Sequence, residues 1–416
     1  MIVQKHVRRM AVAAAILTVI ATPARSDMVS VWNAKAEAIA IEKRLLPPPN
    51  ARGMALLHVA MFEAVNAVDQ RYTPYKVKLA ADRGVSKEAA AAAAAHAVLT
   101  ALHPEQSPGL DAVLKASLTS VPDDDAKSKG IELGKRAAAE ILSLRQNDGA
   151  DVPEAYRPAT TVGVYVPTTV PVSSTYGGVK PWVMEKGSQF RPPPPPALTS
   201  RTWADDLNEI RDLGRRDSTK RTPEQTAIAR FWFVTGPQAW NPIVRQLVAV
   251  KKMDLVDSAR LFALVAIASD DAFIAVFDAK YHYNFWRPIT AIRNADLTGN
   301  KATPRDASWL PLGDTPMHPE YPCAHCITSG AAAVVLMSVL GNDIPEVSMT
   351  SPTAPGVTRT WTRLQDYADE VAAARIYAGF HYRFSNKIAL GMGRKIGELT
   401  VSTRMRSAAI PAASQR

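Results

Sequence analysis

The sequence predicts a mainly α-helical protein: one large helical domain made of two packed helical bundles. Apolar residues recur at helical spacing over much of the 416-residue chain. Residues typical of helix starts and stops flank many of these segments. No stretch shows the sustained alternation with β-branched residues that marks a half-buried strand. We therefore expect helices to form the core.

The first half of the chain contains three predicted helices. Residues 52–69 form an apolar-periodic segment, and residues 86–102 begin at the N-cap candidate Ser86 and include seven consecutive alanines. The third helix is expected over 123–146, because the Asn-Asp-Gly sequence at 147–149 is a typical stop.

The second half contains five more. Thr222-Pro-Glu-Gln225 combines a capping box with proline at the first helical position, and predicts a helix that extends to about Val234. Periodicity predicts the other helices over 253–280, 324–340, 363–378 and 385–403.

A stretch without periodicity separates the two halves. It contains five consecutive prolines at 192–196 and is typical of a long, partly polyproline-like surface connection. The predicted organisation is a signal peptide (1–26), an N-terminal helical half (27–150), a proline-rich connection (151–200), a C-terminal helical half carrying the site (201–405) and a flexible tail (406–416).

The N-terminus predicts export. Lys5, Arg8 and Arg9 precede an apolar run, and small residues flank Arg25 where a signal peptidase would cleave. The run is too short to span a membrane. We expect a secreted or periplasmic protein with no stable membrane span, in a compartment that permits disulfides.

The charge balance favours small anions as ligands. The formal net charge is +10, and the signal segment accounts for four of these charges, which leaves a modest positive field. No dense basic run is interleaved with aromatic residues, so we do not expect a nucleic-acid partner. A homodimer is possible.

The first segment that could carry chemistry includes Lys280 and Arg287. On one continuous helix a spacing of seven places both side chains on the same face, where they could grip two oxygens of an anion. Pro288 would end or bend that helix. Taken alone, the pair also fits a solvated basic face.

The second segment is Pro322-Cys-Ala-His325, which directly precedes an apolar helix. Free backbone N–H groups at a helix N-terminus favour an anion, and His325 would stand beside it as an acid or base. A histidine that only caps or packs is the alternative.

The third segment contains Arg375 and His381. Their spacing of six separates them by about 120° on a straight helix. Convergence therefore requires the helix to end near Gly379 and the chain to turn back. The alternative is a core helix followed by a loop histidine.

The order Lys-x6-Arg-Pro, Pro-x-x-His, Arg-x5-His resembles the signature of the vanadium-dependent haloperoxidases and the type-2 phosphatidic acid phosphatase (PAP2) superfamily. The strings Phe285-Trp-Arg-Pro288 and Tyr321-Pro-Cys-Ala-His325 are most similar to the bacterial haloperoxidase-like branch. The resemblance covers about residues 30–400 and implies the haloperoxidase/PAP2 helical fold.

The resemblance also implies a cofactor site for vanadate, which phosphate can occupy as well. Lys280, Arg287 and Arg375 would bind the oxygens, next to Cys323 and Ala324 at the helix N-terminus.

Two histidines would complete the site. His381 would supply the nitrogen ligand to vanadium, and His325 would be the acid–base group on the opposite side. Lys280 would polarise hydrogen peroxide for attack by halide.

The resemblance leaves two other functions open. In an acid phosphatase acting on a phosphoester, His381 would attack phosphorus and His325 would protonate the leaving alcohol. A non-catalytic protein that binds phosphate or vanadate is the third hypothesis.

Two residues would define the halide pocket. His318 resembles the position that is phenylalanine in chloroperoxidases and histidine in bromoperoxidases. The resemblance therefore implies that bromide is oxidised rather than chloride. Phe277 falls where a halide-pocket tryptophan can occur.

Three positions depart from the family pattern. Cys323 replaces a serine and is a weaker hydrogen-bond donor. Ala324 replaces a glycine and restricts the backbone. Ser385 stands where an acidic residue is often found, so the orientation of a histidine ring must come from elsewhere.

Cys323 and Cys326 form a Cys-x-x-Cys motif and are the only cysteines. A dithiol oxidant would need neighbouring strands, which the sequence does not predict. A local disulfide is the more favoured hypothesis. A zinc site that adds His318 and His325 would be crowded.

Overall fold

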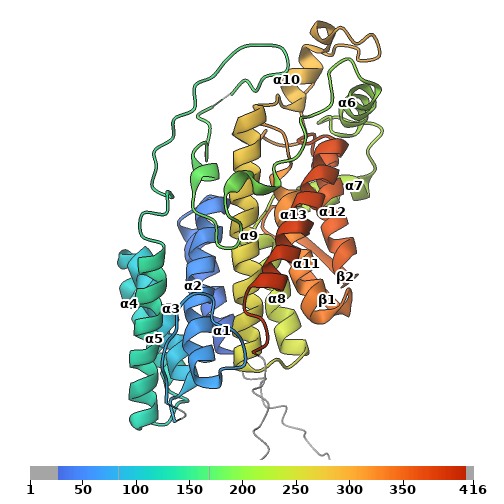
Figure 1. The fold of residues 1–416 in the computed structure, drawn as a ribbon. Helices are drawn as coiled ribbons and strands as arrows, with labels where there is room; N and C mark the ends of the chain where they lie inside the picture. The colour runs from blue at the N-terminus through green and yellow to red at the C-terminus, as the bar shows by residue number, and fades with distance from the viewer. Residues whose placement is uncertain (1–26, 83, 168, 409–416) are drawn as a thin grey trace, which may run out of the picture.

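The computed structural model describes residues 27–82, 84–167 and 169–408, and the predicted signal segment lies outside them. The described chain is mainly helical, as predicted (Figure 1). Its α-helices are α1 (Met28–Glu42), α2 (Pro47–Asp69), α3 (Lys87–Leu102), α4 (Ser107–Leu118), α5 (Asp125–Leu144), α6 (Arg201–Leu213), α7 (Pro223–Phe231), α8 (Pro237–Val250), α9 (Leu255–Tyr283), α10 (Pro288–Arg293), α11 (Ala324–Leu340), α12 (Leu364–Tyr377) and α13 (Arg383–Thr403). Short 3-10 turns are η1 (Pro104–Gln106), η2 (Tyr176–Gly178), η3 (Gly187–Phe190) and η4 (Ala295–Thr298).

Side-chain caps begin several helices where the sequence predicts. The Ser86 side chain accepts from the Ala89 N–H at the start of α3. Thr222 and Gln225 form the predicted reciprocal capping box of α7. These bonds satisfy backbone donors that the first turn of a helix leaves free. The sequence analysis did not predict α1, α4, α6, α8 and α10.

Small residues allow α3 and α5 to pack closely. The alanines at 89–95 of α3 are buried, and Gly134 of α5 lies directly against this run. A Cβ at Gly134 would be only 2.3 Å from the Ala90 carbonyl oxygen. The alanine run is therefore a helix–helix contact surface.

The central helix α9 joins the two halves of the fold. It is buried on nearly all sides, as expected for a helix without a polar face. It packs against α2 and also against α11 and α13, and Figure 1 shows it in the middle of the molecule. Lys280, near its C-terminal end, is thereby placed deep inside the protein.

Two antiparallel strands, which the sequence analysis did not predict, accompany the mainly helical fold. β1 (Asp343–Ser351) pairs with β2 (Ala354–Arg363), with Val347 opposite Trp361. Burial alternates over the second half of β1, but the alternation is short and the sequence analysis did not detect it. The hairpin packs through the Trp361 ring against Tyr367 of α12, with ring centroids 4.5 Å apart.

The proline-rich connection is irregular, as predicted, but it is not only a surface segment. Asp270 of α9 accepts hydrogen bonds from the Tyr176 hydroxyl at 2.6 Å and the Trp182 indole N–H at 2.7 Å. Asp271 accepts from the backbone N–H groups of residues 182–184. Two buried carboxyl groups therefore fasten the connection to α9.

The end of the described chain is paired with the N-terminal half. The Thr73 N–H donates to the Arg406 carbonyl at 2.7 Å, and the Ala408 N–H donates to that of Arg71 at 2.9 Å. The remainder of the predicted tail lies outside the described residues. Within the described ranges, every helix is too short or too polar to cross a bilayer.

Candidate active site

Lys280 and Arg287 reach one site from two helices. α9 ends at Tyr283, and Asn284 follows it in the left-handed conformation with φ 47°. Arg287 is the extended N-cap of α10, and Pro288 is the first residue of that helix. The expectation of one continuous helix was wrong, as was the expectation that Pro288 would end it. A turn of the chain, not helical periodicity, brings the two cations together.

Both cations are buried and bonded to uncharged groups. The Lys280 ammonium donates to the carbonyls of Pro319 at 2.9 Å and Glu320 at 2.8 Å. The Arg287 Nε donates to the His318 carbonyl at 2.8 Å, and Nη1 donates to that of Phe380 at 3.1 Å. These carbonyls hold the side chains in place without neutralising them.

Arg375 enters the same site from the last turn of α12. Its Nη1 donates to the Trp232 carbonyl at 2.7 Å, and its guanidinium lies 4.8 Å from the centre of the Phe380 ring. Its Nε is buried and has no partner among the described residues. Burial is the main cause that lowers the pKa of Arg375 to about 10, and repulsion from Arg287 adds to it.

Three buried cations held by neutral partners make this site suited to an anion. Burying an unpaired charge costs on the order of several kcal/mol in lost solvation. Burial and the charge of Arg287 lower the pKa of Lys280 well below its ordinary value. A bound oxyanion would remove this repulsion and stabilise all three charged forms.

The N-terminus of α11 adds the second predicted motif. Cys323 is the N-cap, and its sulfur accepts from the Cys326 N–H at 3.3 Å, so the helix begins where the sequence predicts. Both thiols are free and buried. Burial opposes ionisation, but the Cys326 thiol and the charge of Arg375 lower the pKa of Cys323.

His325 offers a free nitrogen to the site. The Phe233 main chain hydrogen-bonds its ring, while Nε2 is buried without a partner among the described residues. Burial and then the charges of Arg375 and Lys280 lower its pKa well below the ordinary value. The ring is therefore neutral at physiological pH and able to accept a proton.

The turn predicted after α12 is confirmed. Gly379 has φ +81°, which a residue without a Cβ adopts readily. It directs the chain back so that the N–H groups of Phe380 and His381 both donate to the Arg375 carbonyl, at 3.0 and 3.3 Å. His381 is thereby returned to the side of the site where Arg375 lies.

Two neighbours fix the tautomer of His381. Its Nε2 lies 3.3 Å from Nη1 of Arg287, which can only donate, so Nε2 is the acceptor. Its Nδ1 lies 2.8 Å from Oε1 of Glu320, and the same oxygen accepts from the Tyr382 N–H at 3.1 Å. Nδ1 therefore carries the proton, and the Nε2 lone pair faces the cations. A metal ligand requires this form.

Glu320 is the functional residue that the sequence analysis missed. Its side chain is fully buried, and burial raises its pKa to about 8 against the opposing charges of Lys280 and Arg287. Burial and the same cations lower the pKa of His381. At neutral pH the pair is thus a carboxyl group beside a neutral imidazole. The only sequence signal was an acidic residue between two prolines, next to a predicted motif.

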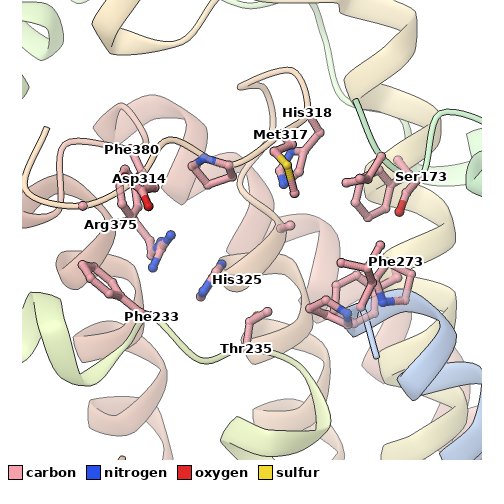
Figure 2. A pocket seen from close by; sticks show the side chains of 18 of the residues that line it. Ser173, Phe233, Thr235, Phe273, Asp314, Met317, His318, His325, Arg375 and Phe380 are labelled. Carbon is pink, nitrogen blue, oxygen red and sulfur yellow. The ribbon is translucent and has the colours of Figure 1, made fainter. Parts of the chain in front are cut away.

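A cavity of about 520 Å³ opens beside these groups. Figure 2 shows the nitrogen-bearing ends of Arg375 and His325 turned toward the same space. Apolar side chains form much of its wall, including Phe233, Phe273, Phe277, Met317 and Phe380. Its size is in the range of sites for small organic molecules.

His318 and Phe277, the predicted halide-pocket residues, both line this cavity. Their rings meet edge to face, with centroids 5.3 Å apart. Nδ1 of His318 lies 2.9 Å from Nη2 of Arg287, which can only donate, and 3.1 Å from the Pro319 carbonyl oxygen, which can only accept. The structure thus brings all nine predicted site residues to one region: Lys280, Arg287, Arg375, Cys323, Ala324, His325, His381, His318 and Phe277. Within the described ranges, no group of three or more His, Cys, Asp or Glu is arranged to hold a metal ion directly.

Comparison with known proteins finds similarity to vanadium-dependent haloperoxidases. Residues 260–409 match the family model described as the VCPO second helical-bundle domain. The vanadium chloroperoxidase of Curvularia inaequalis is 25% identical over 465 residues, which covers 81% of this chain and 74% of that protein.

Two solved structures have similar folds. The structure titled as the first bacterial vanadium-dependent iodoperoxidase aligns with a TM-score of 0.79 and 25% identity, covering 92% of this chain and 97% of the other. An apo bacterial vanadium-dependent chloroperoxidase aligns with a TM-score of 0.66 and 17% identity, covering 86% and 93%. The second supports the fold alone.

Proposed function

We propose that this chain, which is similar to vanadium-dependent haloperoxidases, is a vanadate-dependent haloperoxidase that oxidises halide with hydrogen peroxide. One observation carries the proposal: three buried cations without carboxylate partners lie around an imidazole whose Nε2 lone pair points toward the Arg287 guanidinium. Vanadate, when bound, would supply a Lewis-acidic centre for peroxide.

The chain's own residues divide the work. Lys280, Arg287 and Arg375 would hold the oxygens, and their charges would stabilise the negative charge that develops there. The unpartnered Nε of Arg375 is a donor still free to bind an oxygen. His381 would hold the central atom through Nε2, oriented by the carboxyl of Glu320.

His325 would move the proton. Its unpartnered Nε2 faces the cavity, and its lowered pKa keeps the ring neutral. A neutral imidazole at this position can accept a proton from peroxide and return it to the product oxygen. Replacement by asparagine would preserve polarity but remove this capacity.

We propose bromide rather than chloride as the preferred halide. The His318 imidazole lines the cavity edge to face with the neighbouring Phe277 ring and adds a polar group to an otherwise apolar wall, an arrangement suited to a large and weakly hydrated anion. Because one similar structure is that of a bacterial vanadium-dependent iodoperoxidase, iodide oxidation must be measured beside bromide and chloride oxidation. Relative kcat/KM values for the three halides, in the wild type and in His318→Phe, would test the assignment. Phenylalanine is expected to shift the ratio toward chloride.

Export is also part of the proposal. Residues 1–26 have the composition of a secretory signal. N-terminal sequencing of the mature protein from the producing cells is expected to begin close to Asp27. An intact N-terminus in the cytoplasmic fraction would contradict export.

The decisive experiment compares the full chain with and without orthovanadate. Peroxide-dependent bromination of a phenolic dye is expected only after vanadate addition, and His325→Asn is expected to abolish it while retaining vanadate. If vanadate instead inhibits phosphate release from an aryl phosphate, the protein is a phosphatase. If vanadate binds and neither reaction occurs, the protein is a non-catalytic oxyanion binder.

A further inference from the structure

The two cysteines form a close thiol pair in the first turn of α11. Cys323 is the N-cap, and its sulfur accepts from the backbone N–H of Cys326 at 3.3 Å. A spacing of three residues at a helix N-terminus is the arrangement in which two cysteines can form a local disulfide. They are the only cysteines in the chain, so neither has another partner within it.

The pair also borders the oxyanion site. The charges of Arg375 and Lys280 act directly on the Cys323 sulfur. The next two residues, Ala324 and His325, line the cavity, and the unpartnered Nε2 of His325 marks space for a ligand there. Any route that admits a tetrahedral oxyanion admits the smaller hydrogen peroxide. The thiols are therefore shielded from bulk solvent but adjacent to where peroxide would bind.

We propose that Cys323 is an oxidation site for hydrogen peroxide, and that Cys326 converts the product into a Cys323–Cys326 disulfide inside the oxyanion site. The inference rests on the proposed function only in taking peroxide as the small molecule that enters this cavity. It adds a thiol reaction that requires neither vanadate nor halide.

The reaction balances with one peroxide for each pair of thiols. The Cys323 sulfur attacks one peroxide oxygen, an S–O bond forms, the O–O bond breaks, and the departing hydroxide takes up a proton to leave as water. The Cys326 sulfur then attacks the sulfenic sulfur. An S–S bond forms, the S–O bond breaks, and a second water leaves with the Cys326 proton. Peroxide is reduced by two electrons and the thiols are oxidised by two.

The disulfide would change the anion site. Cys323 would lose its thiol proton and its role as a hydrogen-bond donor toward a bound oxygen. Vanadate or phosphate affinity is therefore expected to fall in the oxidised protein and to return after reduction. A bound anion, in turn, is expected to exclude peroxide from Cys323 and to slow the oxidation.

The test uses the full chain without vanadate or halide. One equivalent of peroxide is expected to remove both titratable thiols, with a mass decrease of two hydrogen atoms and a peptide cross-linked between residues 323 and 326. In Cys326→Ser, a dimedone adduct is expected at Cys323, because no resolving thiol remains. Cys323→Ser is expected to leave the Cys326 thiol intact, which controls for nonspecific oxidation.

Two outcomes would overturn the proposal. The first is survival of both thiols in folded wild-type protein under conditions that oxidise free glutathione. The second is an oxidation rate that saturating orthophosphate does not slow, since that would separate the thiols from the anion site. These measurements do not depend on halogenation, so the inference and the proposed function can fail independently.

Discussion

Oε1 of Glu320 lies 2.8 Å from Nδ1 of His381 and fixes the orientation of the imidazole ring. Position 385, where the family often has a carboxylate, is a buried serine beside this pair. The acidic group has thus been supplied from a different segment, five residues before His325. The same physical requirement, a fixed imidazole tautomer, is met from another direction.

Glu320→Ala is expected to weaken orthovanadate binding by about 10-fold to 100-fold, the usual effect of removing an outer partner of a metal-bound histidine. Glu320→Gln should retain part of the affinity, because its amide oxygen can still accept from Nδ1–H and the Tyr382 N–H. Titration calorimetry with vanadate would measure both. Exposed Glu398 gives the matched control, and Glu398→Ala should leave the affinity unchanged. Equal losses in the alanine and glutamine variants would argue against an orienting role.

Arg375→Lys tests whether the planar fork matters beyond its charge. Lysine keeps a cation, but its single nitrogen cannot occupy both the Nη1 position that donates to the Trp232 carbonyl and the separate Nε position that is free for a bound oxygen. We expect a loss of one charge-assisted hydrogen bond, about 1.5–3 kcal/mol, or roughly tenfold to a hundredfold in vanadate and phosphate affinity. Arg394→Lys, on the exposed face of α13, is the control. Unchanged affinity for both anions in Arg375→Lys would remove Arg375 from the site.

Gly379→Ala is expected to destabilise the fold and displace His381. The positive φ strains any residue with a side chain, by about 1–3 kcal/mol. The added Cβ would also lie 2.6 Å from the Gly214 carbonyl oxygen. Thermal unfolding should show a clear decrease in melting temperature, accompanied by weaker vanadate binding. Gly391→Ala has no heavy atom within 4 Å of the new Cβ, lies inside α13, and should be neutral or slightly stabilising.

Local signals in the sequence predicted which segments are helical and which residues form the site. They predicted less well how these residues are arranged in space. Ser86 and Thr222 act through bonds to residues three positions away, so their caps could be read directly. The relation between Lys280 and Arg287 depends on where α9 ends, and Asn284 ends it without the glycine that usually marks such a turn.

Glu320 could not be identified because its partner is distant in the sequence. It contacts His381 across 61 positions, and no local pattern encodes such a pairing. The β hairpin was not predicted for a different reason. Its alternating burial covers only a few residues of β1, and β2 is mostly exposed, so the packing of Trp361 against α12 that helps to stabilise it could not be predicted from a burial pattern.

His58 makes the stability of the N-terminal half depend on pH. Its Nε2 accepts from Asn33 Nδ2 at 2.8 Å, and its ring stacks on Phe262. Burial, and then the charge of Arg245, lower its pKa from 6.5 to about 3. The unfolded chain therefore binds a proton that the folded chain excludes, and the free energy of unfolding falls as the pH drops below about 6.5 toward 3.

At pH about 5 this single histidine should cost about 2 kcal/mol of stability relative to pH about 7. Other buried titratable groups contribute in every variant, so the informative quantity is the difference between variants in the pH slope. Denaturant titrations across this range are expected to give a shallower slope for His58→Gln, although that variant will be less stable at neutral pH. His282→Gln, at an exposed position, should keep the wild-type slope. An unchanged slope in His58→Gln would mean that His58 is already protonated in the folded protein, contrary to the acceptor role that Asn33 assigns to it.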